Sequence, residues 1–217
     1  MKSFLDTILD VVFPVYCISC KEKGAFLCSR CLLNSPPAER ESADWIFPLF
    51  DYRHIPIKKA IWFLKYKGKR NLAKIFAEAM YGRILEETSD LRMFENFVNP
   101  ILIPIPLAPK RLRERGFNQA TLICNELIDF DKSLNFKLEK NVLSKPKDGE
   151  HQARIKDRNK RLKNIIGCFI VKNPEIIKNR NIILIDDVTT TSATLNEARK
   201  ILKQAGAKKI IAFTIAH

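Results

Sequence analysis

The chain has 217 residues, of which 46% are hydrophobic and 29% charged; these globular proportions exclude disordered, collagen-like and low-complexity classes. Lysine and arginine outnumber the acids by 38 to 24, and the formal net charge of +14 favours polyanionic partners: nucleic acid, phosphorylated ligands or an anionic membrane surface. No apolar run approaches the roughly 20 residues of a transmembrane helix, and Asp6 and Asp10 interrupt the apolar N-terminal stretch, so we expect a cytoplasmic protein.

Four of the six cysteines lie close together in the pattern C-x2-C-x7-C-x2-C. They are Cys17, Cys20, Cys28 and Cys31. Each C-x-x-C pair can place two thiolates on one metal ion, so two pairs complete a tetrahedral site. We expect structural zinc, because four thiolates leave no open position for a catalytic water and a reducing cytosol disfavours disulfides. An iron–sulfur cluster, a pair of redox disulfides and unpaired buried cysteines are the alternatives. Cys124 and Cys168 stand among apolar residues and are expected in the core.

Residues 34–44 form a polar, proline-containing stretch that marks the best domain boundary. We therefore expect a four-cysteine module over residues 1–36 and a larger domain over residues 44–217. Residues 45–53 have the pattern of a strand or a hairpin arm. A helical pattern over residues 57–66 ends near Gly68, and a second helix follows. One face of that helix is apolar: Leu72, Ile75, Phe76, Ala79 and Ile84.

The first of these helices lies in a basic stretch with three aromatic residues. Residues 58–70 place six cations around Trp62, Phe63 and Tyr66. Exposed aromatic rings among cations suit single-stranded nucleic acid, because bases stack on the rings and phosphates meet the cations. The alternative, which we favour for the aromatic residues, is an amphipathic helix that turns Trp62 and Phe63 toward the core.

The rest of the chain alternates strands and helices. Residues 101–107 predict a buried strand that ends in a proline-marked turn, and residues 117–128 predict a helix. Residues 144–163 are basic and lack an apolar period, so we expect a long exposed loop, followed by a strand over residues 166–171. Residues 181–187, 194–205 and 208–216 read as strand, helix and strand, which is a βαβ unit. The fold class is therefore α/β with a mostly parallel sheet.

The strongest candidate site is the segment ILIDDVTTTSAT at residues 183–194. A buried strand runs into two acids, then into a run of hydroxyl side chains, then into a helix. Free N–H groups and the positive dipole end of that helix can hold a phosphate, helped by the loop hydroxyls. Asp186 and Asp187, at the carboxyl end of the strand, are placed to bind sugar hydroxyls with the help of a metal ion. The alternative is a simple helix cap, which needs only one of these residues.

The sequence DDVTTTSAT resembles the phosphoribosyl-pyrophosphate (PRPP) motif of type I phosphoribosyltransferases. The resemblance implies that Asp186 and Asp187 bind the ribose and that the following loop holds the 5′-phosphate. That loop comprises Thr190, Thr191, Ser192, Ala193 and Thr194. One residue departs from the family pattern: Ser192 stands where these enzymes usually have glycine, which permits close backbone approach and an unusual φ.

Residues 102–120, LIPIPLAPKRLRERGFNQA, resemble the RGFNQ signature of the ComF family of competence proteins. The four-cysteine module and residues 52–73, with their LKY element, resemble further parts of that family. A later stretch also matches, with Gln152, Arg161, Asn164, Gly167 and Phe169. The resemblance covers nearly the whole chain and implies a zinc module over residues 1–36 and a phosphoribosyltransferase-like domain over residues 44–217.

The resemblance also implies ligands and partners. PRPP would bind with Mg²⁺, its pyrophosphate held by the turn Pro106, Leu107 and Ala108. Arg111 and Arg115, with the two acids, are the implied catalytic residues, and the basic loop would close over the ligand. The family acts in DNA uptake during natural transformation, which implies single-stranded DNA, and allows other DNA-uptake proteins, as partners. Two alternatives remain open: an active phosphoribosyltransferase on a nucleobase or other acceptor, and a non-catalytic DNA-binding adaptor with a vestigial PRPP site.

Overall fold

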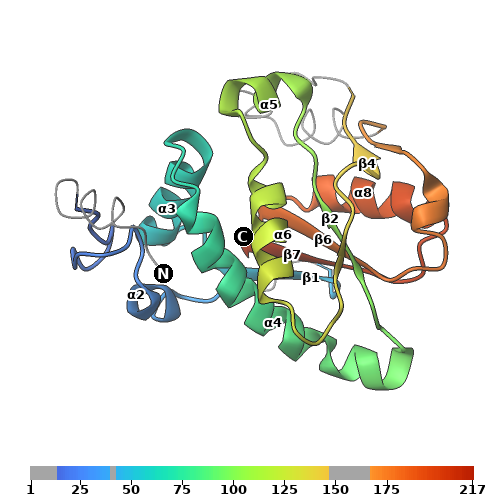
Figure 1. Cartoon of the computed structure of the whole chain (residues 1–217), viewed down its shortest axis with the longest axis horizontal. Coiled ribbons are helices and arrows are strands. Elements are labelled where there is room, and N and C mark those ends of the chain that lie inside the picture. Colours follow the sequence, from blue (N-terminus) through green and yellow to red (C-terminus); the bar gives the residue numbers. More distant parts are fainter. Residues whose placement is uncertain (1–13, 40–42, 147–166) are drawn as a thin grey trace.

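The computed structural model describes residues 14–39, 43–146 and 167–217. Its centre is a five-stranded sheet in the order β1-β7-β6-β2-β3, in which every pairing is parallel (Figure 1). The strands are β1 Ile46–Phe50, β2 Ile101–Pro104, β3 Lys137–Leu138, β6 Ile182–Val188 and β7 Ile210–Ala216. A separate antiparallel ribbon pairs β4 Leu143–Ser144 with β5 Ile170–Val171. The predicted α/β class with a mostly parallel sheet is confirmed.

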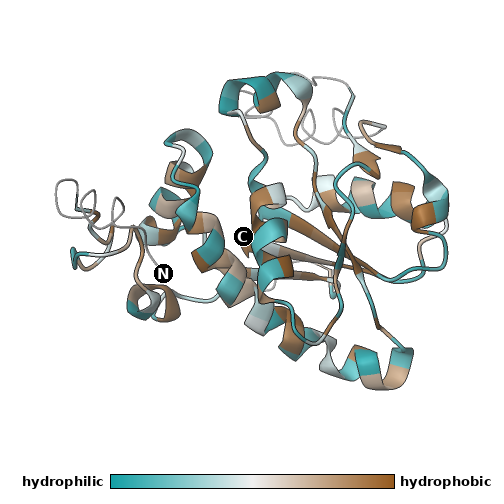
Figure 2. Ribbon diagram, in the orientation of Figure 1, coloured by the Kyte–Doolittle hydropathy of each residue, from teal (hydrophilic) through white to brown (hydrophobic). Residues whose placement is uncertain are grey.

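Helices cover both faces of this sheet. The described helices are α2 Ser29–Leu33, α3 Ile55–Tyr66, α4 Asn71–Glu95, α5 Pro109–Arg115, α6 Gln119–Phe130 and α8 Ala193–Gln204, with a 3-10 turn η1 at Pro174–Ile176. Of these, α3, α4 and α6 lie on one face of the sheet and α8 lies on the other. Side chains alternate along a strand, so Ile183 and Ile185 pack with α3, α4 and α6, whereas Ile182 and Leu184 pack with α8. Figure 2 shows the mainly hydrophobic strands at the centre. In the described parts of the chain, no helix is long and apolar enough to cross a membrane.

Several local predictions need correction. Of the two alternatives for residues 45–53, the strand is confirmed and the hairpin arm is not, since β1 is a parallel edge strand that pairs with β7 inside the sheet. The strand predicted over residues 166–171 shrinks to Ile170–Val171 and lies outside the main sheet. The prediction that Trp62 faces the core is wrong: it is 44% exposed, whereas Ile61 and Leu64 beside it are buried. The basic loop, with Gln152, Arg161 and Asn164, lies outside the described residues.

The cysteine segment packs on the helices beside the sheet. Leu27 and Leu32 are buried in the same hydrophobic cluster as the inner residues of α3 and α4. The ring of Phe26 meets the ring of Phe63 edge-on, with 6.1 Å between centroids. Contacts of this kind fix the segment against α3. The domain boundary between residues 36 and 44 stays a prediction.

Candidate functional site

A cleft of about 400 Å³ opens at the carboxyl ends of β6, β2 and β1. This is the edge at which parallel α/β sheets bind ligands. The cleft is lined by Tyr52, Lys65, Ile105, Pro106, Leu107, Ala108, Arg111, Arg115, Lys145, Asp186, Asp187, Val188, Thr190 and Thr194. The fold thus brings the two acids, the turn at residues 106–108, both arginines and part of the hydroxyl loop to one place.

The two acids occupy consecutive positions near the end of β6, so their side chains leave opposite faces of the sheet. Asp187 is buried and points to the α3 side, where its Oδ1 lies 2.7 Å from Nζ of Lys65. Its backbone N–H donates a hydrogen bond of 2.8 Å to Oδ1 of Asp186. The ammonium group of Lys65 therefore offsets the charge of Asp187, and the backbone N–H of Asp187 stabilises the carboxylate of Asp186.

Burial raises the pKa of Asp186 from its usual range to about 7, and the neighbouring charge of Asp187 raises it further. The N–H of Asp187 and the cations Lys65 and Lys145 lower this pKa, but less strongly. Asp186 is thus a carboxyl group poised to release its proton near neutral pH when a cation approaches.

Replacing Asp186 by asparagine is expected to change how stability depends on pH. Because the pKa of Asp186 is raised in the folded chain, the folded chain keeps a proton that the unfolded chain releases near pH 4. The stability that Asp186 contributes is therefore present below about pH 4 and is lost as the pH rises to about 7. Asparagine does not titrate, so the free energy of unfolding of Asp186→Asn does not fall in this way. As the pH rises, the variant should become more stable than the native chain, by up to about 4 kcal/mol at about pH 8. Thermal unfolding at several pH values without divalent cations measures this, and a pH-independent difference would contradict it.

The hydroxyl loop connects β6 to α8, and its members do not all face the cleft. Thr190 and Thr194 line it, whereas Thr191, Ser192 and Ala193 are absent from its lining. Ser192 has φ +54° and ψ 2°, a left-handed conformation that glycine adopts without strain, which gives a physical reason for glycine at this point in the related enzymes. Its buried Oγ has no hydrogen-bond partner among the described residues. The backbone keeps the loop shape here at some cost in strain.

The RGFNQ segment mainly connects β2 to α6. Gly116, at φ +74°, ends α5, and Asn118 caps α6 by accepting from the N–H of Ala120. The Asn118 amide also donates to the carbonyl of Ile105 at 2.9 Å, which fixes the turn that lines the cleft. Arg115 donates to Gln119 Oε1 at 2.8 Å and reaches the hydroxyl of Tyr66 at 3.2 Å. This arginine is therefore held in place before any ligand arrives.

Gly167 and Phe169, which belong to the stretch that resembles the ComF pattern, both make specific contacts. The N–H of Gly167, at φ +70°, donates to the buried carboxylate of Glu197 on α8 at 2.7 Å. Phe169 is buried, and Nζ of Lys145 lies 5.5 Å from its ring centroid. The second contact helps to place Lys145 at the edge of the cleft.

The site predictions do not include Tyr52 or Lys65, which both line the cleft. A signal for Lys65 exists in the sequence: it follows Ile57 and Ile61 at intervals of four, on the buried stripe of α3. A lysine on an apolar stripe indicates a charge with a partner. Tyr52 lies two residues after the edge strand β1, and its only signal in the sequence is its place at the start of the 52–73 stretch that resembles the ComF family.

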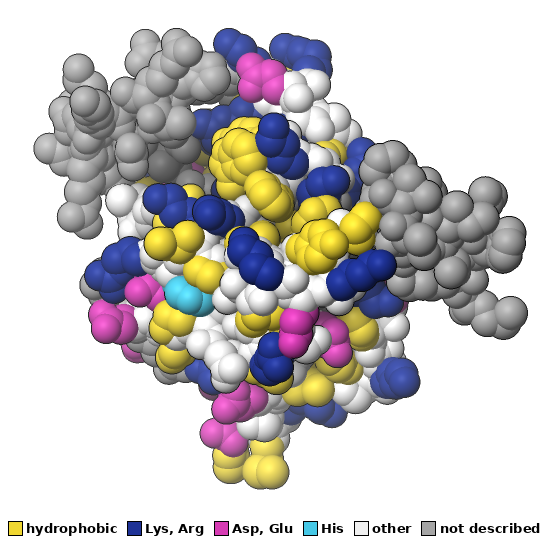
Figure 3. Space-filling view, turned by 90° about the vertical axis from the view of Figure 1, so that its left-hand side faces the viewer, with side chains coloured by type: hydrophobic (Ala, Val, Ile, Leu, Met, Phe, Trp, Pro, Cys, Tyr) yellow, Lys and Arg dark blue, Asp and Glu magenta, His cyan; other side chains and the backbone are white. Residues whose placement is uncertain are grey.

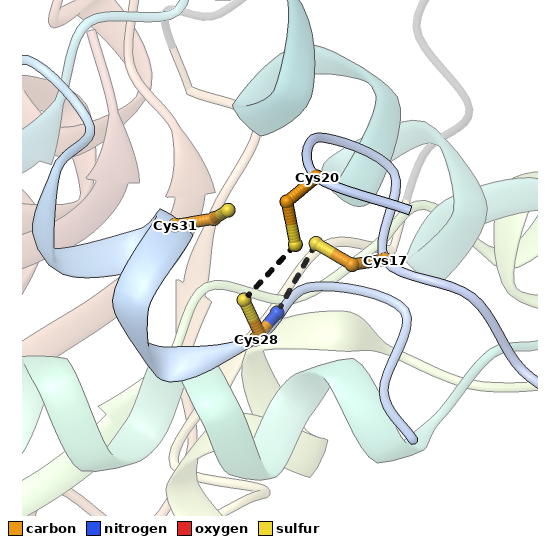
Figure 4. Close-up of side chains that lie close together, drawn as sticks. All are labelled: Cys17, Cys20, Cys28 and Cys31. Carbon is orange, nitrogen blue, oxygen red and sulfur yellow. Dashed lines mark hydrogen bonds between the residues drawn. The ribbon is translucent and has the colours of Figure 1, made fainter. Parts of the chain in front are cut away.

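The four clustered cysteines form a second candidate site. Their sulfur atoms all lie within 4.8 Å of one another, and the side chains converge between a turn and the start of α2 (Figure 4). Sγ of Cys20 and Sγ of Cys28 are 3.7 Å apart, close to the ~3.8 Å between two thiolates on a tetrahedral zinc ion with 2.3 Å bonds. The N–H of Cys28 donates to Sγ of Cys17. The donor set and its spacing fit zinc.

Charge also favours a cation among these sulfur atoms. Burial raises the pKa of Cys17, but the N–H groups of Cys28, Cys20 and Ser19 outweigh it and lower that pKa to about 6. For Cys28 the N–H of Cys31 lowers the pKa, yet burial and the neighbouring thiols raise it to about 11. One thiolate thus forms readily and then opposes the next, unless a metal ion neutralises them.

Comparison with known proteins adds two kinds of likeness. A family model described as "Phosphoribosyl transferase domain" matches residues 114–217. Competence protein F of Haemophilus influenzae is 29% identical over 211 residues, which are 94% of this chain and 85% of that protein. Competence protein ComFC of Streptococcus pneumoniae is 31% identical over 70% of this chain and 59% of its own length. DNA utilization protein YhgH of Escherichia coli K12 is 27% identical over 84% of this chain and 74% of its own length.

Proposed function

The chain belongs to the ComF family of competence proteins, and from this premise we propose that it binds PRPP with Mg²⁺ and acts in DNA uptake, handling single-stranded DNA in the cytoplasm. The observation that carries the first part is the meeting of Asp186 and Asp187 with the hydroxyl loop and the basic turn in one cleft.

Each part of PRPP has a counterpart in this cleft. The carboxylates of Asp186 and Asp187 would accept hydrogen bonds from the ribose hydroxyls. The 5′-phosphate would lie at the start of α8, where N–H groups have no partner inside the helix and the hydroxyls of Thr190 and Thr194 can donate. The pyrophosphate would lie along Pro106, Leu107 and Ala108. Its charge would be met by the cations at the rim: Arg111, Arg115 and Lys145.

The oxygen atoms of the cleft suit Mg²⁺, which prefers carboxylate and phosphate ligands. Asp186 and Asp187 are the residues that would hold it, directly or through the ribose. When bound, the ion supplies positive charge that stabilises the pyrophosphate group. Lys65 already places such a charge beside Asp187, with its Nζ 2.7 Å from Oδ1 of that residue. The four cysteines would hold zinc as a structural ion that fixes the N-terminal segment against α3.

The DNA part of the proposal is supported by the relatives and by charge. Two of these relatives are called competence proteins and a third a DNA utilization protein. A chain with a net charge of +14 attracts the phosphates of nucleic acid at low salt. PRPP alone needs far fewer cations than the chain carries, so most of this charge is available for a larger polyanion.

Calorimetric titration with PRPP in the presence of Mg²⁺ tests the ligand directly. We expect one PRPP per chain, with an affinity that falls when Mg²⁺ is removed, because the ion offsets the repulsion between ligand phosphates and the acids. Ribose 5-phosphate and pyrophosphate serve as matched controls, since each fills only part of the cleft and should bind more weakly. A chain that binds all three equally, or none of them, would refute the PRPP site.

A further inference from the structure

Helix α3 exposes two large aromatic side chains on the side away from the core. Trp62 is 44% exposed and Tyr66 57%, and they lie one helical turn apart with 6.1 Å between ring centroids. A hollow of about 330 Å³ adjoins Trp62 and is lined by Tyr52, Ile55, Lys58, Lys59 and Trp62 itself. We define the α3 surface as Tyr52, Ile55, Lys58, Lys59, Trp62, Tyr66 and Lys67. Contiguous exposed apolar groups that are rimmed by polar residues mark interaction sites.

The charge of the α3 surface has one sign. Helix α3 contains no acidic residue, and its lysines lie among the exposed rings. Nζ of Lys67 is 5.3 Å from the ring centroid of Trp62, and Cζ of Arg115 is 5.0 Å from that of Tyr66. Nζ of Lys58 lies 5.9 Å from the ring of Tyr52. Figure 3 views this side of the molecule and shows hydrophobic side chains interspersed with lysine and arginine. Such a surface complements a polyanion that also presents flat apolar groups.

We propose that single-stranded DNA docks on the α3 surface, with bases stacked on Trp62 and Tyr66 and phosphates beside Lys58, Lys59 and Lys67. Unpaired bases offer π-faces for the rings, and the backbone supplies the negative charge that the lysines match. A duplex hides its base faces, and an acidic peptide would meet the lysines without needing the rings. This inference rests on the proposed DNA-handling function and names the surface that performs it.

The α3 surface is continuous with the cleft. Tyr52 lines both the hollow and the cleft. Arg115 lines the cleft and donates to the hydroxyl of Tyr66. Lys65, on the same helix, pairs with Asp187 inside the cleft. A strand lying across α3 would therefore pass the mouth of the cleft. Trp62 itself is not among the residues that line the cleft, so Trp62→Ala removes no cleft residue.

The test is fluorescence anisotropy with a dye-labelled oligothymidylate and the full chain at several salt concentrations. Trp62→Ala should weaken binding by about 5- to 150-fold, the loss of one base–ring stack. Lys58→Ala/Lys59→Ala should reduce the slope of log affinity against log salt by about 1.4, since each phosphate contact on a single strand contributes about 0.7. Phe94→Ala and Lys178→Ala are the controls: Phe94 is 78% exposed at the end of α4, and Lys178 is exposed before β6.

The outcomes separate this inference from the proposed function. If the native chain binds the oligonucleotide and Trp62→Ala binds it with the same affinity as Phe94→Ala, the α3 surface is not the DNA site. The proposed DNA-handling function would then still stand. A native chain with no salt-dependent binding to the oligonucleotide would overturn both. An equal loss by Trp62→Ala on duplex and single strand would refute base stacking, whereas a loss confined to the single strand supports it. PRPP titration and thermal unfolding of Trp62→Ala should match the native chain, which shows that the fold and the cleft are intact.

Discussion

The variant Asp186→Asn/Asp187→Asn is expected to bind PRPP with Mg²⁺ at least about 100-fold more weakly than the native chain. Asparagine keeps the shape of aspartate but removes its charge, so it cannot hold Mg²⁺ and accepts weaker hydrogen bonds from the ribose. Each hydrogen bond to a charged group is worth about 1.5–3 kcal/mol, and losing two of them gives at least this factor. Calorimetric titration under identical Mg²⁺ and salt measures the change.

The stability of this variant needs its own control, because Asp187 is the partner of Lys65. Both side chains are mostly buried, and a cation left without its partner in such a place costs about 3–5 kcal/mol. Lys65→Met/Asp187→Asn removes both charges and should melt closer to the native temperature. The single variant Asp186→Asn removes a carboxyl group that burial disfavours, so it should fold normally. It should nevertheless bind PRPP more weakly than the native chain. If Asp186→Asn/Asp187→Asn is folded and binds PRPP as well as the native chain does, PRPP must bind elsewhere on the molecule.

The second large effect is expected at the four cysteines. Cys28→Ser should lower the metal content from about one zinc per chain to well below one, and should lower the melting temperature and the soluble yield with it. Serine offers a poor ligand for zinc in place of a thiolate, and structural zinc contributes directly to folding free energy. Elemental analysis of purified protein measures the metal, and thermal unfolding measures the stability.

Cys124→Ala provides the matched control, since Cys124 is buried on α6 away from the cluster. It should lose some packing energy yet keep the full metal content. The metal that is found also distinguishes the alternatives: zinc supports the structural site, whereas iron with a visible charge-transfer band would indicate an iron–sulfur cluster. Equal metal content in Cys28→Ser and the native chain would exclude the cysteine cluster as the metal site.

The parts of the fold that sequence patterns predict well are those with strong periodicity. The segments that form β6, α8 and β7 are long, apolar and bounded by clear turns, so their order and type follow from the pattern. Strand β3 has only two residues and therefore no period to detect. The full length of α4 is hard to predict because the apolar residues of its last two turns are mostly exposed and do not continue the buried stripe, and only the left-handed Asn96 marks its end. Tertiary pairing, not local preference, makes the 46–50 segment a parallel strand.

The candidate site likewise contains some residues that the sequence predicts and others that it does not. The acids and the hydroxyl loop are consecutive in the chain, so the sequence alone is enough to recognise their chemistry. Tyr52 and Lys65 come from a different part of the chain and reach the cleft only because β1 and α3 pack beside β7 and β6. Trp62 is an error of the opposite kind, a residue predicted in the core that lies at the surface. The amphipathic pattern assigns this apolar residue to the core, but the helix turns it outward. Rotation of a helix about its axis is set by packing partners that a single sequence does not reveal.

Both edges of the sheet resist the addition of another strand. Strand β3 is too short to act as a template, and β1 carries Pro48, which has no N–H to donate. The outer side of β1 is also covered, since the N–H of Ala38 bonds to the carbonyl of Leu49 and the N–H of Asp51 to that of Pro36. Edge-to-edge aggregation and recruitment of a partner by β-augmentation are therefore both disfavoured. A partner of the folded protein would therefore have to recognise its side chains and not the backbone of a sheet edge.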